Sequence, residues 1–242
     1  MLALREDLKL KLKERWAPPE VFENVLSVDD IEYLLNEELT NDNKRLLPKR
    51  VFGLNTTQSQ RYLHSKLQSI LKFPFKITGG NFFRTSVPYM LHADTGIDEN
   101  CALYRIVVFP LSITCNENTQ YDEHFNSLTI MDQRWYHQAA FFMKGEEHRF
   151  DVKKKEYNQP VNDYSLIDGY VNTPFSKERF DDIFSHLNYD SFEGMSELFT
   201  APWRIGDAIT FDRSNIHTAS NFLKANVCEK IGLTFFTEYI DL

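Results

Sequence analysis

The segment WRIGDAITFDRSNIHTASNF, Trp203–Phe222, holds a Gly-Asp turn, a short apolar strand and then a histidine. The strand is DAITF at 207–211, a run whose β-branched and aromatic residues favour a buried strand. His217 follows it and is a candidate ligand. A single histidine defines no site, so its meaning depends on a second set of ligating side chains elsewhere in the chain.

That second set lies in LHADTG, Leu91–Gly96, between a strand-like run and a turn. The period of a strand points His92 and Asp94 to one face. Chance alone supplies about half of one His-x-Asp triplet in a chain of this composition, so the motif by itself is weak. Together with His217 it provides two imidazoles and one carboxylate, which is the facial triad of non-haem Fe(II) oxygenases.

These motifs resemble the Fe(II)/2-oxoglutarate-dependent dioxygenases, most clearly the branch that contains phytanoyl-CoA dioxygenase and the prolyl-4-hydroxylase-like enzymes. The resemblance runs from His92 to Phe236, more than half of the chain. It implies that His92, Asp94 and His217 bind Fe(II) and that the fold is a double-stranded β-helix. It also implies 2-oxoglutarate and O₂ as co-substrates, and a basic residue after the distal histidine that binds the far carboxylate of 2-oxoglutarate.

Lys230 is the expected basic residue, because it opens the strand-like run KIGLTFFTEYI. Alternation puts Lys230 and Gly232 on one face and the larger apolar residues on the other. A lysine that begins a hydrophobic strand needs a reason, which an anionic ligand supplies, and Gly232 would leave room for a small molecule. The alternatives are a lysine that reaches solvent from the strand end and a rival anchor, Lys224, in an expected loop. Many relatives have Arg here and a hydroxyl two residues later, so the second donor to the carboxylate stays unassigned.

The rest of the chain predicts an α+β protein that is mainly β. Residues 1–72 read as helices, with Ser27 and Asp30 in a capping-box arrangement. From Phe73 onward, short β-rich runs indicate an antiparallel barrel or sandwich. Residues 112–200 are interpreted as an insert that shapes the mouth of a pocket. With no strong linker, we expect one domain over 1–242: a jelly-roll or cupin-like barrel with N-terminal helices packed on it.

Composition limits the function further. The net charge of −8 argues against general nucleic-acid binding. No apolar run reaches the roughly 18 residues of a membrane helix, and the N-terminal segment lacks a signal-peptide core, which predicts a cytoplasmic protein. The three cysteines show no CxxC spacing, so neither a disulfide framework nor a cysteine zinc site is indicated.

The leading hypothesis is a hydroxylase that converts 2-oxoglutarate to succinate and CO₂ while it oxidises an organic substrate. Asp94 favours hydroxylation over halogenation, since the related halogenases lack this carboxylate. A cupin-like metalloenzyme without 2-oxoglutarate, which would not need Lys230, and a non-catalytic β-helix binding module are the alternatives. A Ser-His-Asp triad of Ser214, His217 and Asp212 is rejected, because members so close in sequence could hardly orient one another.

The substrate is not fixed by the sequence and could be a small metabolite, a lipid or a peptide. The 20 Phe and 11 Tyr indicate either a thick β core or an aromatic-lined cavity. Trp135 and Tyr136 in the expected insert are candidates for an aromatic wall and equally for the core.

Overall fold

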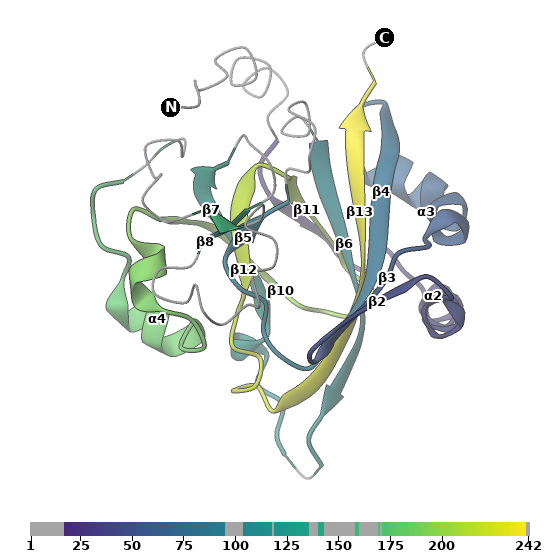
Figure 1. Cartoon of the computed structure of the whole chain (residues 1–242). Coiled ribbons are helices and arrows are strands. Elements are labelled where there is room, and N and C mark those ends of the chain that lie inside the picture. The colour runs from purple at the N-terminus through teal and green to yellow at the C-terminus, as the bar shows by residue number, and fades with distance from the viewer. Residues whose placement is uncertain are drawn as a thin grey trace.

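Two antiparallel sheets dominate the computed structural model, which describes residues 17–94, 104–117, 119–135, 140–142, 158–159, 169 and 171–240. The large sheet has seven strands in the order β1-β11-β6-β13-β4-β3-β2, and the small sheet has six in the order β10-β7-β12-β5-β8-β9. Only the β8–β9 pair in these sheets is parallel. Figure 1 shows the large sheet beside helices α2 and α3, with α4 on the far side of the small sheet.

From β4 to β7, and again from β10 to β13, successive strands alternate between the large and the small sheet. Those of the large sheet are β1 Glu20–Phe22, β2 Lys44–Leu47, β3 Arg50–Gly53, β4 Phe75–Thr85, β6 Tyr104–Cys115, β11 Ala208–Asp212 and β13 Val227–Tyr239. Those of the small sheet are β5 His92–Ala93, β7 Ser127–Arg134, β8 Ala140–Phe142, β9 Asn158–Gln159, β10 Glu197–Pro202 and β12 Asn215–Ala219.

Helices α2 (Val28–Thr40) and α3 (Thr57–Ile70) cover the outer face of the large sheet. The predicted capping box is present: the Ser27 side chain accepts from the Asp30 N–H, and the Asp30 carboxylate accepts from the Ser27 N–H. Leu34, Leu63 and Leu67 are fully buried against the strands. One apolar side of each helix therefore packs on the sheet.

The core falls into layers that the alternation of each strand defines. On β13, Leu233 and Phe235 face the helices. Between the sheets, Ile209 and Phe211 of β11 pack against Ile130 of β7. Outside the small sheet, α4 (Lys177–Ile183) completes a third cluster, whose buried members include Leu91, Met131, Trp135, Phe184 and Phe192. The space between the sheets is the one into which β5 and β12 direct their histidines.

Several sequence expectations need correction. The segment before Phe73 is not purely helical, because within its described part β1, β2 and β3 add three strands to the large sheet. Residues 112–200 are not an insert throughout, because β7 and β10 are paired strands of the small sheet. Short polar strands such as β2 and β3 carry no period-2 apolar pattern of their own, and tertiary pairing determines them.

Trp135 belongs to the core and not to a cavity wall. Its side chain is 2% exposed and meets the Phe142 ring edge-on at 5.4 Å in the cluster under α4. Tyr136 lies outside the described residues. The hypothesis of an aromatic wall is therefore wrong for Trp135.

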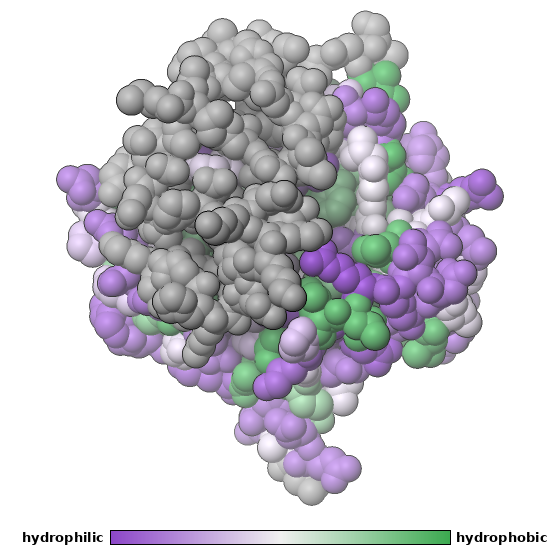
Figure 2. Space-filling model, in the orientation of Figure 1, coloured by the Kyte–Doolittle hydropathy of each residue, from purple (hydrophilic) through white to green (hydrophobic). Residues whose placement is uncertain are grey.

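On the face of the molecule shown in Figure 2, the described surface is mainly hydrophilic, with hydrophobic residues in small groups. In the part of the chain that the structure describes, no helix is both long enough and apolar enough to cross a membrane. The cytoplasmic location stays a prediction.

Candidate metal centre

His92, Asp94 and His217 come together between the sheets. β5 and β12 pair so that His92 and His217 are direct cross-strand neighbours, with ring centroids 4.1 Å apart. Asp94 follows β5, and its Oδ2 lies 3.7 Å from Nε2 of His92 and 3.5 Å from Nε2 of His217. One ligand atom from each residue can be chosen so that all lie within 4.8 Å of one another. Three donors at this spacing can share one metal ion.

The sequence expectation for His217 is corrected in one detail. It lies within its own strand, β12, which returns after the turn at Asp212–Asn215. In the sequence, DAITF is the recognisable strand and NIHTA is a polar one that pairs with β7 and β5. The pairing explains how a histidine so far along the chain reaches His92.

Both imidazoles are oriented by their own backbone. Nδ1 of His92 donates to the carbonyl of Met90 at 2.7 Å, and Nδ1 of His217 donates to the carbonyl of Asn215 at 3.0 Å. A proton held on Nδ1 places the lone pair of each ring on Nε2, the nitrogen that lies nearest Asp94. This second layer of hydrogen bonds is typical of histidines that bind metals.

The protonation states also suit a metal. Burial and, to a smaller extent, the neighbouring His217 lower the pKa of His92 to about 3, so the ring is neutral at pH 7. Burial alone would raise the pKa of Asp94, but the opposing effects of His92, His217 and Arg213 outweigh it and lower the pKa. Neutral imidazoles and an ionised carboxylate are the forms that bind a divalent cation. The residues present therefore fit an Fe(II)-type ion.

The three residues have close neighbours from β11 of the large sheet and from the segments that precede β5 and follow β11. The ring of Tyr89 meets His92 edge-on at 4.5 Å, and Phe211 meets His217 at 4.7 Å. Arg213 donates from Nε to the main-chain oxygen of Asp94 at 2.6 Å. These contacts fix the rings and anchor the backbone at Asp94, where β5 has ended.

Lys230 is buried on the inner face of the large sheet. Its side chain is 3% exposed, and Nζ lies 3.9 Å from the ring centre of Trp203 and 5.0 Å from that of Phe222. Among the described residues Nζ makes no hydrogen bond or ion pair, and burial lowers the pKa of Lys230 well below its usual value. Nε1 of Trp203 is also buried without a hydrogen-bond partner. A buried cation beside an indole N–H donor could hold an anion.

The expectations about Gly232 and about Lys224 as a rival anchor have different outcomes. Gly232 does not leave room for a ligand, because an added Cβ would lie 2.5 Å from Phe83 and 3.0 Å from Trp203. The glycine lets these two rings cross the strand, and Trp203 then packs under Lys230. Lys224 is exposed and donates to the main-chain oxygens of Asp181 and Asp182 at the end of α4. Lys224 is therefore far less suited than Lys230 to hold an anionic ligand.

Comparison with known proteins adds to this geometry. No family model and no curated protein sequence matches the chain. Solved structures do match: the non-haem α-ketoglutarate-dependent epimerase SnoN from nogalamycin biosynthesis aligns with a TM-score of 0.54 and 11% identity over 97% of this chain and 83% of SnoN. HygX from Streptomyces hygroscopicus, with nickel, 2-oxoglutarate and hygromycin B bound, aligns with a TM-score of 0.51 and 14% identity over 98% of this chain and 88% of HygX.

The apoform of EctD from S. alaskensis aligns with a TM-score of 0.50 and 11% identity over 96% of this chain and 76% of EctD. The chain has the fold of the iron- and 2-oxoglutarate-dependent oxygenases. At 11–14% identity the alignment speaks for the fold and not for the reaction. The mostly antiparallel sheets and the His-Asp-His cluster within this oxygenase fold agree with the resemblance in the sequence.

Asp212 and Ser214 have structural roles beside the metal centre. Asp212 accepts from Arg105 and from Arg134 at 2.9 Å each, and Arg134 also donates to Oγ of Ser214 at 2.9 Å. This buried network joins β6, β7 and β11. Its geometry agrees with the rejection of a Ser-His-Asp triad, because the carboxylate is committed to two guanidinium groups.

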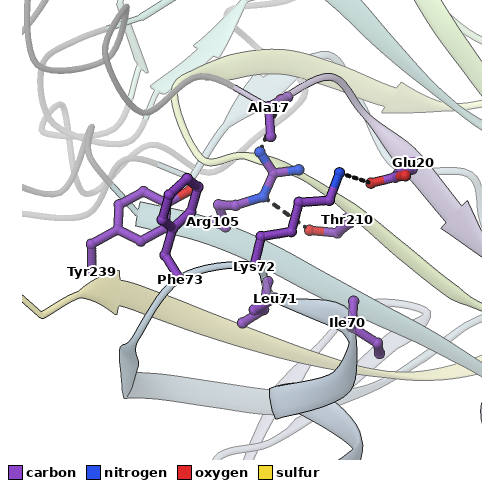
Figure 3. A pocket seen from close by; sticks show the side chains of 9 residues that line it. All are labelled: Ala17, Glu20, Ile70, Leu71, Lys72, Phe73, Arg105, Thr210 and Tyr239. Atoms are coloured by element: carbon purple, nitrogen blue, oxygen red, sulfur yellow. Dashed lines mark hydrogen bonds and ion pairs between the residues drawn. The ribbon is translucent and has the colours of Figure 1, made fainter.

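Figure 3 shows a crevice at the outer end of the large sheet, lined by none of the three candidate ligands. Its polar groups are mutually satisfied: Lys72 lies 3.6 Å from Glu20, and Arg105 donates to Thr210 and Asp212. The crevice is a packing feature between the end of α3 and the sheet.

Three further residues near the centre were missed by the sequence analysis: Arg50, Tyr89 and Arg213. Arg213 lies four residues before His217, and Tyr89 lies three residues before His92, so both are adjacent in sequence to the predicted ligands. Neither has a motif of its own. Arg50 lies in a strand that the sequence analysis did not expect, and only the pairing of β3 with β4 brings it to this side of the molecule.

Proposed function

We propose that the chain is an Fe(II)- and 2-oxoglutarate-dependent oxygenase that hydroxylates an organic substrate. The observation that carries the proposal is the His92, Asp94 and His217 cluster, with both Nε2 atoms directed at the carboxylate, in a fold shared with such enzymes. We further propose that the sheets form a double-stranded β-helix and that residues 1–242 make one domain.

In this proposal His92 and His217 bind the iron through Nε2 and Asp94 binds it through one carboxylate oxygen. Fe(II), together with 2-oxoglutarate and O₂, supplies the oxidation of a substrate C–H bond, with succinate and CO₂ as the co-products. A ligand set of three leaves coordination positions for 2-oxoglutarate and O₂. The chain holds the His92 ring in the neutral form and keeps Asp94 ionised.

Lys230 binds the distal carboxylate of 2-oxoglutarate in this proposal. The support is its burial without an ionic partner, which costs free energy that a bound carboxylate would offset. Nε1 of Trp203, unpartnered beside it, is proposed as the second donor, in place of the hydroxyl that Gly232 cannot supply. The aromatic rings around Nζ keep water away, which strengthens the charge interaction.

Hydroxylation is proposed over a cupin-like reaction because Lys230 has no use without a dicarboxylate, and over halogenation because Asp94 completes the ligand set. SnoN is an epimerase, so the fold accommodates another outcome. The substrate is proposed to be a small organic molecule, in line with hygromycin B bound to HygX.

The test is an anaerobic titration of the protein with Fe(II) and then 2-oxoglutarate. We expect the weak visible absorption band that appears when 2-oxoglutarate chelates Fe(II), followed by slow succinate formation once O₂ is admitted. Lys224→Met serves as the matched control and should behave as the unaltered protein does. Tight metal binding with neither band nor succinate would favour a cupin-like enzyme or a non-catalytic binding module.

A further inference from the structure

Arg50 stands in one row with Lys230 across the large sheet. Thr85 of β4 is the direct partner of Arg50 on β3 and of Lys230 on β13. Residues directly opposite in antiparallel strands point to the same face, so Arg50 projects from the inner face as Lys230 does. With strands about 4.8 Å apart, the two Cα atoms are roughly 10 Å from each other.

Arg50 also lacks an acidic partner. Its Nη2 donates to the main-chain oxygen of Pro88 at 2.7 Å, and its guanidinium lies 4.4 Å from the centre of the Tyr89 ring. Nε is buried without a hydrogen bond, and no carboxylate of the described residues forms an ion pair with Arg50. Burial lowers the pKa of the guanidinium, so the folded chain bears an uncompensated cost for this charge.

His186 adds a second buried polar group next to Arg50. It follows α4, and both of its ring nitrogens are buried without a hydrogen bond of good geometry. Burial lowers the pKa of His186 to about 4, with the main chain of Tyr89 opposing and Arg50 adding to the effect, so both residues are close neighbours. The ring is neutral at pH 7 and presents one N–H donor.

Tyr89 connects this pair to the metal centre. Its ring lies under the Arg50 guanidinium on one side and meets His92 at 4.5 Å on another. Arg50, Tyr89 and His186 are each partly exposed, while Nε of Arg50 and the ring nitrogens of His186 lie beneath the surface. A molecule held by Arg50 would be one aromatic ring away from a candidate iron ligand.

We propose that Arg50 and His186, backed by Tyr89, form a second anion subsite that binds a carboxylate or phosphate group of the primary substrate. The subsite rests on the proposed function for its role, because 2-oxoglutarate takes Lys230 and the substrate takes Arg50. It narrows the substrate class to organic acids or phosphate esters, whose anionic group is held while another carbon lies near the metal. The tether to Pro88 alone uses only one nitrogen of the guanidinium and does not account for the buried Nε.

The test uses the full chain loaded with Mn(II) and 2-oxoglutarate, since Mn(II) accepts the same nitrogen and oxygen ligands. Benzoate is the probe and benzamide, its uncharged counterpart, is the control ligand. Protons of a molecule bound near Mn(II) relax faster, so NMR relaxation reports binding close to the centre. We expect enhancement for benzoate and none for benzamide.

Arg50→Gln should weaken benzoate binding by about ten-fold or more, as expected for a lost charge-assisted contact. Arg45→Gln, an exposed arginine on the neighbouring strand β2, is the matched control and should bind as before. Arg50→Lys should recover part of the affinity, which a purely structural defect would not allow. Equal relaxation with benzamide, unchanged binding in Arg50→Gln, or no benzoate effect in any form would overturn the subsite.

Failure of the proposed function is detected separately, from the EPR signal of free Mn(II) during the titration. If Mn(II) does not bind, saturation-transfer NMR with benzoate on the metal-free Lys230→Met chain still tests the subsite. Binding that depends on Arg50 there supports the anion subsite without the oxygenase. Binding that does not depend on Arg50 there rejects it.

Discussion

The two faces of the large sheet treat their cations differently. On the outer face, Arg84 pairs with Glu38 of α2 at 2.8 Å and with Glu229 of β13 at 3.1 Å. On the inner face, Lys230 and Arg50 are buried or half-buried with no ionic partner among the described residues. Neighbouring strands thus carry basic side chains on both faces, but carboxylates pair with Arg84 and not with Lys230 or Arg50 among the described residues.

The presence or absence of a carboxylate partner distinguishes cations that stabilise the fold from cations that, on our proposal, bind a ligand. A buried charge is costly unless it is paired, and a protein that only needed stability would replace it by an apolar residue. The outer pairs join helix to sheet and so belong to the folded chain itself. The inner cations have their partners, on our proposal, in 2-oxoglutarate and the substrate. Substitutions on each face test whether the two groups of cations differ in this way.

The largest expected effect is loss of metal in His217→Ala. Removing one of three ligands should weaken metal binding by more than about 100-fold, because second-layer changes alone cost 10- to 100-fold. Co(II) or Mn(II) titration measures it, and His124→Ala, an exposed histidine paired with Asp182, is the control. Equal metal affinity in the two variants would contradict the assignment of His217.

Next in size is the response of 2-oxoglutarate binding to Lys230→Met. The substitution keeps the bulk of the stem and removes the charge, so a contact of roughly 1.5–3 kcal/mol is lost. Affinity for 2-oxoglutarate should fall by roughly 10- to 100-fold, with metal affinity nearly unchanged. Calorimetric titration of the metal-loaded protein checks both, with Lys224→Met as the matched control. The reverse pattern, a loss in Lys224→Met alone, would mean that the anchor is misassigned.

The features that could be predicted from the sequence are those that depend on residues close together in the chain. The His-x-Asp pair was predictable because it depends on the period of one short strand, and the inward face of Lys230 followed from alternation within one run. Both are local properties. The mainly-β architecture and the capping box at Ser27 and Asp30 were predictable for the same reason.

What the sequence could not supply is register between strands distant in the chain. Arg50 reaches the row of Lys230 only through pairing of both with Thr85, and β12 reaches β5 only through the pairing of two histidines. Gly232 in the sequence suggests space for a ligand, but the side chains of Phe83 and Trp203 occupy the space beside it. A glycine in a strand indicates that another group approaches the backbone closely, but the sequence does not show whether that group is a ligand or a side chain.

The comparison of faces also predicts opposite stability changes in the metal-free protein. Arg84→Met should lower the free energy of unfolding by about 1–3 kcal/mol, because it leaves the 2% exposed carboxylate of Glu38 unpaired. Lys230→Met should leave the free energy of unfolding unchanged or raise it, because it removes an unpaired buried charge. Denaturant unfolding of both variants measures the two signs. If Lys230→Met lost as much stability as Arg84→Met, the conclusion that the two faces use their cations differently would be wrong.

The smallest and most specific effect is a dependence of stability on alkaline pH. Burial lowers the pKa of Lys230 in the folded chain below the 10.5 that it has when unfolded. Between those two pKa values the unfolded chain binds the additional proton, so the free energy of unfolding rises with pH across that window, by at most about 1.4 kcal/mol per pH unit. Below the folded pKa both states hold the proton, and the dependence disappears.

The measurement is the difference in free energy of unfolding between the unaltered protein and Lys230→Met, taken at several pH values up to about 10.5 in the absence of metal and 2-oxoglutarate. Taking the difference cancels the titration of all other groups, and Lys224→Met, whose lysine is exposed, should give a flat difference. Saturating 2-oxoglutarate in the metal-loaded protein should flatten the rise, because a bound carboxylate stabilises the charged lysine and restores its pKa. A difference that stays flat without ligand would show that Lys230 keeps its charge at no cost, and the inner face would then need no anion.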